Sequence, residues 1–358
     1  MIITSFDPKH GRLSALIESP EDLWVLRRLI RKGDVVVTKS SKVVKREEEY
    51  SRPDKGERVK VTIALEVEEV HLDSSVGRIR IRGTIKEASD ETISRTGTHA
   101  QSLSPGHAFT LRKVRWSALD IRLVNSSKNV NKRFILIAID RREAGVGTLS
   151  GSHLAIVASI DSGLGGKMSQ EQSSEPFFRK VLGVVKETSR EGDTILVAGP
   201  GHTKLTLGNL LSDDPSIGKM VRVIEGFDLA GADGVRGLLK FPGFHKVAAD
   251  SSVVEIQGLV NEAVKRISTN DGKVAYSLPR VREAAVAGAI DRCAVTDFVF
   301  SGPTKEDEVV DTMNTIEAQG GKVYLADSSL EFGKQVSAFG GIVALLRYAF
   351  RTYQSEGR

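Results

Sequence analysis

Apolar and polar residues alternate along the first third of the chain, and this pattern predicts β-strands. Residues 78–87 show it most clearly, because isoleucines and arginines take alternate positions and therefore lie on opposite faces of a strand. The arginines of that strand are Arg78, Arg80 and Arg82. We also expect a hairpin formed by residues 2–6 and 12–17, and long strands over 34–44 and 58–72.

One helix is predicted among these strands. Ser19 is its expected N-cap, Pro20 takes the first helical position, and Gly33 follows the last turn. A further strand is predicted over Ser117–Val124. A single short helix within a strongly curved antiparallel sheet is typical of a small barrel, so this part of the chain predicts an Sm-like β-barrel.

In the rest of the chain, apolar strands alternate with helices, which predicts two α/β sandwich domains. The expected strands of the middle part are 133–140, 153–160, 194–198 and 220–224, and its helices are 175–190, 205–211 and 234–240. Because 153–160 is nearly all apolar, we expect it at the centre of its sheet. In the last part, helices are expected over 253–268, 280–289, 305–319 and 330–338, and strands over 295–300, 322–325 and 342–347.

Two breaks divide the chain into predicted domains at 1–127, 128–248 and 249–358. The first break is the polar segment 125–129, and the second is Phe241-Pro242-Gly243-Phe244. The first domain holds 23 Lys and Arg against 18 Asp and Glu, the second 16 against 13, and the third 12 against 15. A basic first domain and an acidic last domain predict a polyanionic partner for the first domain.

Composition points to a cytoplasmic protein. The chain has one cysteine, Cys293, so no disulfide can form within it, which fits a reducing compartment. We expect Cys293 to be a small buried core residue. No apolar run approaches the roughly 20 residues that a membrane helix needs, and the first residues lack the features of a signal peptide.

Several short motifs follow one another along the chain. They are Ser19–Trp24, Ile30–Asp34, Thr96–His99, Ala198–Lys204, Ala287–Asp297, Gly320–Tyr324, Glu331–Val336 and Phe339–Tyr348. Their order, over nearly the whole chain, resembles the Pelota family, the rescue paralogues of class-1 translation termination factors. The motifs before residue 35 favour this family over the termination factors, whose first domain is unrelated.

The resemblance implies a monomeric factor that rescues stalled ribosomes in no-go mRNA surveillance. Such a factor enters an empty A site with a GTPase related to elongation factor 1 alpha and promotes subunit separation with a recycling ATPase. GTP would belong to the GTPase, because this chain has no P-loop. No tightly bound cofactor and no membrane association are expected.

The resemblance also implies that loop 46–57 probes the decoding site. Basic side chains in and beside this loop would bind RNA phosphates without selecting a sequence, which suits a factor that acts on any codon. The candidates are Lys45, Arg46, Arg52 and Lys55, although Glu47, Glu48 and Glu49 oppose RNA there. Arg78, Arg80 and Arg82 are further RNA-binding candidates, as are Lys132, Arg133, Arg141 and Arg142.

Termination factors hydrolyse peptidyl-tRNA with a Gly-Gly-Gln motif, which this chain lacks. The comparable loop has Gly165, Gly166 and Lys167 instead. A lysine cannot orient water as the glutamine does, and its charge suits phosphate. A peptidyl-tRNA hydrolase is therefore the weaker of two enzymatic alternatives.

The other alternative is an endoribonuclease that depends on a divalent metal, an activity described for some relatives. Metal-assisted hydrolysis needs converging carboxylates, and Glu21 and Asp22 are the candidate ligands, with Asp7 and Asp34 as neighbours. The same pair suits the first turn of a helix, where acidic residues interact favourably with the helix dipole. Both interpretations remain open from the sequence.

Overall fold

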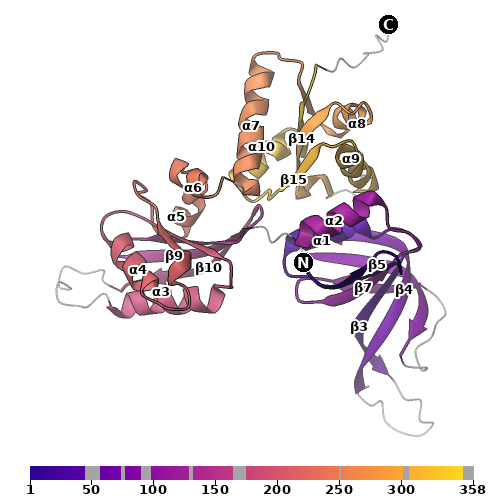
Figure 1. The fold of residues 1–358 in the computed structure, drawn as a ribbon, viewed down its shortest axis with the longest axis horizontal. Coiled ribbons are helices and arrows are strands. Elements are labelled where there is room, and N and C mark those ends of the chain that lie inside the picture. The colour runs from indigo at the N-terminus through magenta and orange to yellow at the C-terminus, as the bar shows by residue number, and fades with distance from the viewer. Residues whose placement is uncertain are drawn as a thin grey trace.

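The computed structural model describes residues 1–44, 57–73, 77–89, 98–128, 132–163, 175–249, 251–300 and 306–349. The strands of this part of the chain form three separate sheets in chain order, of seven, five and four strands. Figure 1 shows the third sheet and its helices lying between and above the other two. The predicted fold class, a β-rich first domain followed by two α/β domains, is confirmed.

The first sheet is antiparallel throughout. Its order is β1 (Ile2–Asp7), β2 (Arg12–Leu16), β7 (Ala108–Arg112), β3 (Val35–Val44), β4 (Glu57–Asp73), β5 (Arg78–Ala88) and β6 (Thr98–Leu103). The Thr38 hydroxyl of β3 donates a hydrogen bond to the Gln101 side chain of β6, although two strands separate β3 from β6 in the sheet. The sheet is thus curled strongly enough to bring these inner faces together, as in a small barrel.

Two helices, α1 (Pro20–Leu29) and α2 (Ala118–Lys128), pack against this sheet. The predicted strand over Ser117–Val124 is wrong, because these residues begin α2. The Ser117 N–H donates to Asp120 Oδ2 at 3.0 Å and the Asp120 N–H donates to Ser117 Oγ at 3.1 Å, which caps the helix. Strands β6 and β7 were not predicted from the sequence.

The central sheet has the order β10 (His153–Asp161), β9 (Glu143–Ser150), β8 (Phe134–Ile139), β11 (Thr194–Ala198) and β12 (Val221–Val223). The prediction that 153–160 lies at the centre is wrong, since β10 is an edge strand. The missed strand β9, rich in glycine, separates β10 from β8, and every residue of β8 is buried. β8 is therefore the core strand.

Helices cover both faces of the central sheet. The helices are α3 (Glu175–Thr188), α4 (Thr203–Ser212), α5 (Gly231–Leu238) and α6 (Pro242–Val247), with a 3₁₀ turn at Gly218–Met220. Ile135 and Ile137 of β8 pack with α3 and α4, whereas Phe134 and Leu136 pack in the cluster of α5 and α6. Gly199 has φ 140°, and a Cβ there would lie 1.9 Å from the Ile139 carbonyl oxygen, so only glycine suits this predicted turn.

The third sheet has the order β13 (Val274–Tyr276), β16 (Ile342–Leu346), β14 (Ile290–Thr296) and β15 (Lys322–Ala326). Its helices are α7 (Ser252–Ser268), α8 (Leu278–Val286), α9 (Glu306–Ala318) and α10 (Glu331–Ala338), with a 3₁₀ turn at Asp297–Phe300. The strand predicted at 295–300 instead begins at Ile290 and ends at Thr296. Cys293 of β14 is fully buried, as predicted.

Apolar packing joins the second and third domains to each other more closely than it joins either of them to the first domain. One cluster of buried residues runs from β8 and α6 through α7 to β16. The core of the first domain is a separate cluster, and its Trp24 also packs against the core of the third. Among the described residues, no helix is long and apolar enough to cross a membrane.

Candidate RNA-binding surface and interdomain contacts

The arginine row of β5 lies on the outer face of the first sheet. Arg80 and Arg82 are exposed and Arg78 is half-buried, while Ile79 and Ile81 are fully buried, as the alternation predicts. The row faces an acidic row on β4: Arg78 lies 3.2 Å from Asp73, Arg82 3.3 Å from Glu69, and Lys86 2.7 Å from Glu66. The predicted cationic face is therefore a face of mixed charge.

Arg80 differs from the other two arginines. Its neighbour across the strand pair is His71 rather than a carboxylate. Within the described residues, no acidic side chain forms an ion pair with Arg80. Arg80 is consequently the member of the row best suited to bind a phosphate.

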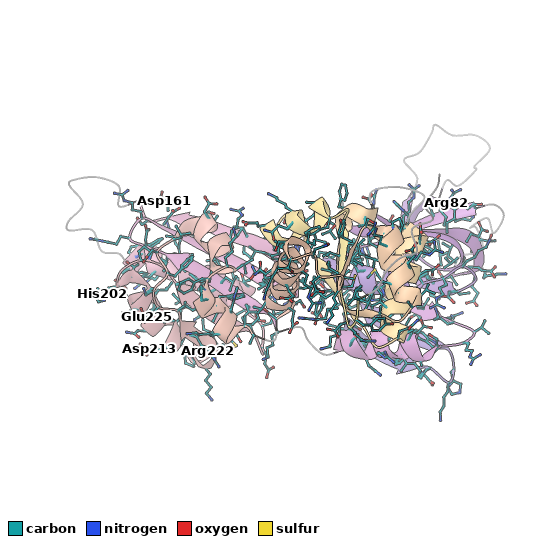
Figure 2. The ribbon with its side chains drawn as sticks, turned by 90° about the horizontal axis from the view of Figure 1, so that it is seen from above. Arg82, Asp161, His202, Asp213, Arg222 and Glu225 are labelled. Atoms are coloured by element: carbon teal, nitrogen blue, oxygen red, sulfur yellow. The ribbon has the colours of Figure 1, made fainter. Side chains whose placement is uncertain are left out.

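Two further loops hold residues that the sequence singles out, one predicted to bind RNA and one in place of Gly-Gly-Gln. Lys45, Arg46, Arg52 and Lys55 lie outside the described residues, in the connection between β3 and β4. Gly165, Gly166 and Lys167 also lie outside them, between β10 and α3. Figure 2 shows Asp161, the last residue of β10, and Arg82 of the first domain towards opposite ends of the long axis.

Of the central-domain candidates, Arg133 has a structural partner. Its guanidinium donates to Asp193 Oδ2 at 2.7 Å and to the Thr188 carbonyl at 3.1 Å. Burial lowers the pKa of Arg133 and raises the pKa of Asp193, partly offset by their mutual attraction. Arg141 and Arg142 are exposed in the turn between β8 and β9, and their role in RNA binding stays a prediction.

Glu21 and Asp22 point to different partners. Asp22 is 6% exposed and turns back on the start of α1, where its Oδ2 accepts the N–H groups of Glu18 at 2.8 Å and Ser19 at 3.1 Å. Its Oδ1 accepts from the amino group of Met1 at 2.7 Å. Glu21 instead reaches the central domain, where its Oε1 accepts the Ser152 N–H at 2.7 Å. The two carboxylates cap a helix and join two domains.

The neighbouring acids do not gather around this pair either. Asp34 accepts from the Lys113 ammonium at 2.9 Å, and Asp7 from His10 at 2.5 Å. Among the described residues, no group of three or more His, Cys, Asp or Glu side chains could hold a metal ion. The geometry thus assigns the capping role to Asp22 and an interdomain role to Glu21.

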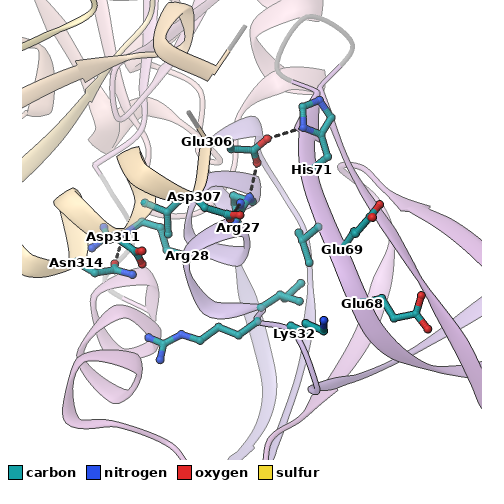
Figure 3. A pocket seen from close by; sticks show the side chains of 14 residues that line it. Arg27, Arg28, Lys32, Glu68, Glu69, His71, Glu306, Asp307, Asp311 and Asn314 are labelled. Carbon is teal, nitrogen blue, oxygen red and sulfur yellow. Dashed lines mark hydrogen bonds and ion pairs between the residues drawn. The ribbon is translucent and has the colours of Figure 1, made fainter. Parts of the chain in front are cut away.

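The last turn of α1 forms a charged contact with α9 (Figure 3). Arg27 donates to Glu306 and Asp307, and Arg28 donates to Glu317 at 2.7 Å and to Asn314 at 2.9 Å. This contact was not predicted from the sequence. Its local signal was present, since α1 ends in basic residues and α9 begins with acidic ones.

A second polar contact joins the central and third domains. His153 Nδ1 lies 2.9 Å from Asp327 Oδ2, and this hydrogen bond raises the pKa of His153 above 6.5. Burial works to raise the pKa of Asp327, but the hydrogen bonds from His153 and Ser329 outweigh it and lower that pKa below 3.8. The pair is therefore charged on both sides over a window between these values.

This window gives a pH prediction. The contribution of His153 to stability is complete below about pH 6.5 and is lost as pH rises through its raised pKa. The contribution of Asp327 is present above 3.8 and is lost as pH falls through its lowered pKa. We expect His153→Asn to lower the melting temperature at pH 5.5 and to have almost no effect at pH 8.5. Thermal melts at both pH values check this, and an equal loss at both would contradict it.

Family models match both ends of the chain. Residues 2–128 match the Pelota N-terminal domain, and residues 253–350 match eRF1 domain 3. The protein is thus of the class that shares its last domain with translation termination factors. The chain belongs to the Pelota family, as its motifs predicted.

Relatives match along the full length. A Pelota homologue of Nitrosopumilus maritimus (strain SCM1) is 34% identical over 98% of this chain and 100% of its own. A Pelota homologue of Cenarchaeum symbiosum (strain A) is 32% identical over 97% of this chain and 99% of its own length. The crystal structure of the Thermoplasma acidophilum Pelota protein has a TM-score of 0.65 at 18% identity, covering 98% of this chain and 100% of that one. The similarity of that structure shows a shared fold.

Proposed function

We propose that this protein recognises stalled ribosomes in no-go mRNA surveillance. It enters the empty A site with a translational GTPase related to elongation factor 1 alpha, and it promotes subunit dissociation with a recycling ATPase. The observation that carries the proposal is the family match over 98% of the chain. GTP would be bound by the GTPase, and the protein would act in the cytoplasm as a monomer.

The arrangement of the domains suits this role. The long strands β3 and β4 extend away from α1 and α2 (Figure 1). In the connection between these strands, Lys45, Arg46, Arg52 and Lys55 would contact RNA phosphates. Gly165, Gly166 and Lys167 would stand in place of the hydrolytic motif of termination factors, so peptidyl-tRNA would stay intact. The three parts of the factor would be the domains 1–127, 128–248 and 249–358.

The endoribonuclease alternative is not favoured. Its candidate ligands Glu21 and Asp22 are engaged in separate hydrogen bonds that point away from a common ion. A metal-dependent hydrolase needs carboxylates that converge on one position. The contacts of this pair support a structural role.

A reconstituted splitting reaction tests the proposal. Ribosomes stalled at the end of a truncated mRNA, with an empty A site, are mixed with this protein, the GTPase, the recycling ATPase, GTP and ATP. We expect free subunits on a sucrose gradient only when this protein is present, with the peptidyl-tRNA unhydrolysed on a gel. Ribosomes whose A site holds tRNA are the control and should stay joined. Equal splitting with and without this protein would overturn the proposal.

A further inference from the structure

A groove of about 520 Å³ lies between the first and third domains (Figure 3). One wall is formed by the last turn of α1 and the segment that follows it, which together present four cations: Arg27, Arg28, Arg31 and Lys32. The other wall is α9, which presents Glu306, Asp307 and Asp311. Glu68 and Glu69 of β4 complete the charged lining. With α9 in place, the five acidic side chains of the lining outnumber its four cations by one. Without α9, only the two glutamates of β4 remain, and the cations outnumber them by two.

The helix α9 covers the cations of α1 as an anionic ligand would. The side chains of Arg27 and Arg28 are 6% and 7% exposed, and both are held by α9 carboxylates. Glu306 also accepts the backbone N–H of Leu72 at 2.9 Å and lies 2.5 Å from His71 Nδ1. Carboxylates and phosphates make the same forked contacts with a guanidinium. The contacts of α9 are therefore of the kind that RNA phosphates would make.

The contact between the first and third domains does not merge their apolar cores. Trp24 packs against the core of the third domain, and its ring meets Phe300 edge-on with centroids 4.5 Å apart. The core of the first domain is otherwise its own cluster, whereas the second and third domains share one. Ion pairs at such an interface contribute little net free energy, because forming them removes both charges from water. A competing polyanion therefore needs only a modest affinity to displace α9.

We propose that Arg27, Arg28, Arg31 and Lys32 form a binding site for RNA phosphates that α9 occupies in the closed protein. α9 then acts as an internal competitor, and RNA binding opens the contact between the first and third domains. RNA is the partner because the first domain has the largest positive net charge of the three domains and, on the proposed function, approaches ribosomal RNA. The acidic last domain and the basic first domain thus partly neutralise each other until RNA replaces α9.

Three variants test the competition. The uncovered variant is Asp307→Asn/Asp311→Asn/Glu317→Gln, which leaves the buried Glu306 intact. The matched control is Glu283→Gln/Asp291→Asn/Glu308→Gln, which removes as much charge from the third domain but none from the groove lining. The exchange variant is Arg28→Glu/Glu317→Arg, which restores the attraction while removing one cation from α1.

Each variant is studied by two measurements, energy transfer and fluorescence anisotropy. Dyes on Val114→Cys and Val286→Cys, which replace exposed residues, report the distance between the first and third domains by energy transfer. Cys293 is fully buried and stays unlabelled. Fluorescence anisotropy reports binding to a single-stranded 20-nucleotide poly-U RNA and to a poly-glutamate peptide. Because no ribosome is present, the result is independent of the splitting reaction.

We expect the uncovered variant to lose energy transfer and to bind poly-U about tenfold more tightly than the wild type. The control should match the wild type in both measurements. The exchange variant should keep wild-type energy transfer and bind poly-U no better than the wild type. Unchanged RNA affinity in the uncovered variant, an equal gain in the control, or an equal gain for poly-glutamate would each overturn the proposal. If the uncovered variant bound poly-U more tightly as expected but ribosome splitting failed, only the proposed function would be contradicted.

Discussion

Replacing Asp22 by alanine is expected to lower the free energy of unfolding of the first domain by about 2–3 kcal/mol. Asp22 is 6% exposed, and its carboxylate accepts from two backbone N–H groups before α1 and from the Met1 amino group. Alanine would remove the acceptor of the two backbone N–H groups and would leave the buried Met1 amino group only the Glu18 carboxylate, at 3.5 Å. Urea denaturation followed by circular dichroism measures the change.

The matched control for this prediction is Asp22→Asn. Its amide oxygen can still accept from the backbone, so we expect it to retain more stability than Asp22→Ala while losing the ionic attraction to Met1. Equal stability of the wild type and Asp22→Ala would show that these hydrogen bonds contribute nothing. The result would then reopen other roles for this carboxylate.

This prediction also changes how a nuclease test is designed. A double substitution of Glu21 and Asp22 would abolish any activity by destabilising α1, whether or not the pair binds metal. Glu21→Gln is the sharper variant, because its amide oxygen can still accept the Ser152 N–H. Magnesium-dependent cleavage of a stem-loop RNA that disappears in folded Glu21→Gln protein would support the nuclease, and unchanged cleavage would exclude this ligand.

Removing the four cations of the β3–β4 connection is expected to weaken binding to stalled ribosomes by about 10²–10³-fold. The variant is Lys45→Ala/Arg46→Ala/Arg52→Ala/Lys55→Ala. Each cation that neutralises a phosphate releases counterions, so the slope of log affinity against log salt should fall by about 3 in magnitude. Pelleting with ribosomes at several salt concentrations measures both quantities.

The same connection offers an internal control. Glu47→Gln/Glu48→Gln/Glu49→Gln removes repulsion from RNA and should bind as tightly as the wild type or more tightly. If the four-cation variant and this variant lost affinity equally, the effect would come from the shape of the connection and not from its charge. The salt slope separates the two cases.

The sequence by itself determined the local faces and the family. The alternation over 78–87 placed the isoleucines inside and the arginines outside, because successive residues of a strand point to opposite sides. The order of the motifs along the chain indicates the family, because it depends on the sequence alone. Strand 194–198 and the turn at Gly199 also followed from local rules, since burial and φ are decided within a few residues.

Tertiary structure decided which other segments of the chain those faces contact. Ser117–Val124 is apolar enough for a strand, yet its capping pair and its packing on the first core make it a helix. β10 is apolar but lies at an edge, because the glycine-rich β9 takes the inner place. Arg27 meets Glu306 across 279 positions of chain. Local patterns report that a side chain is charged or buried, whereas its partner depends on how distant segments pack, and that choice is made only by the folded chain.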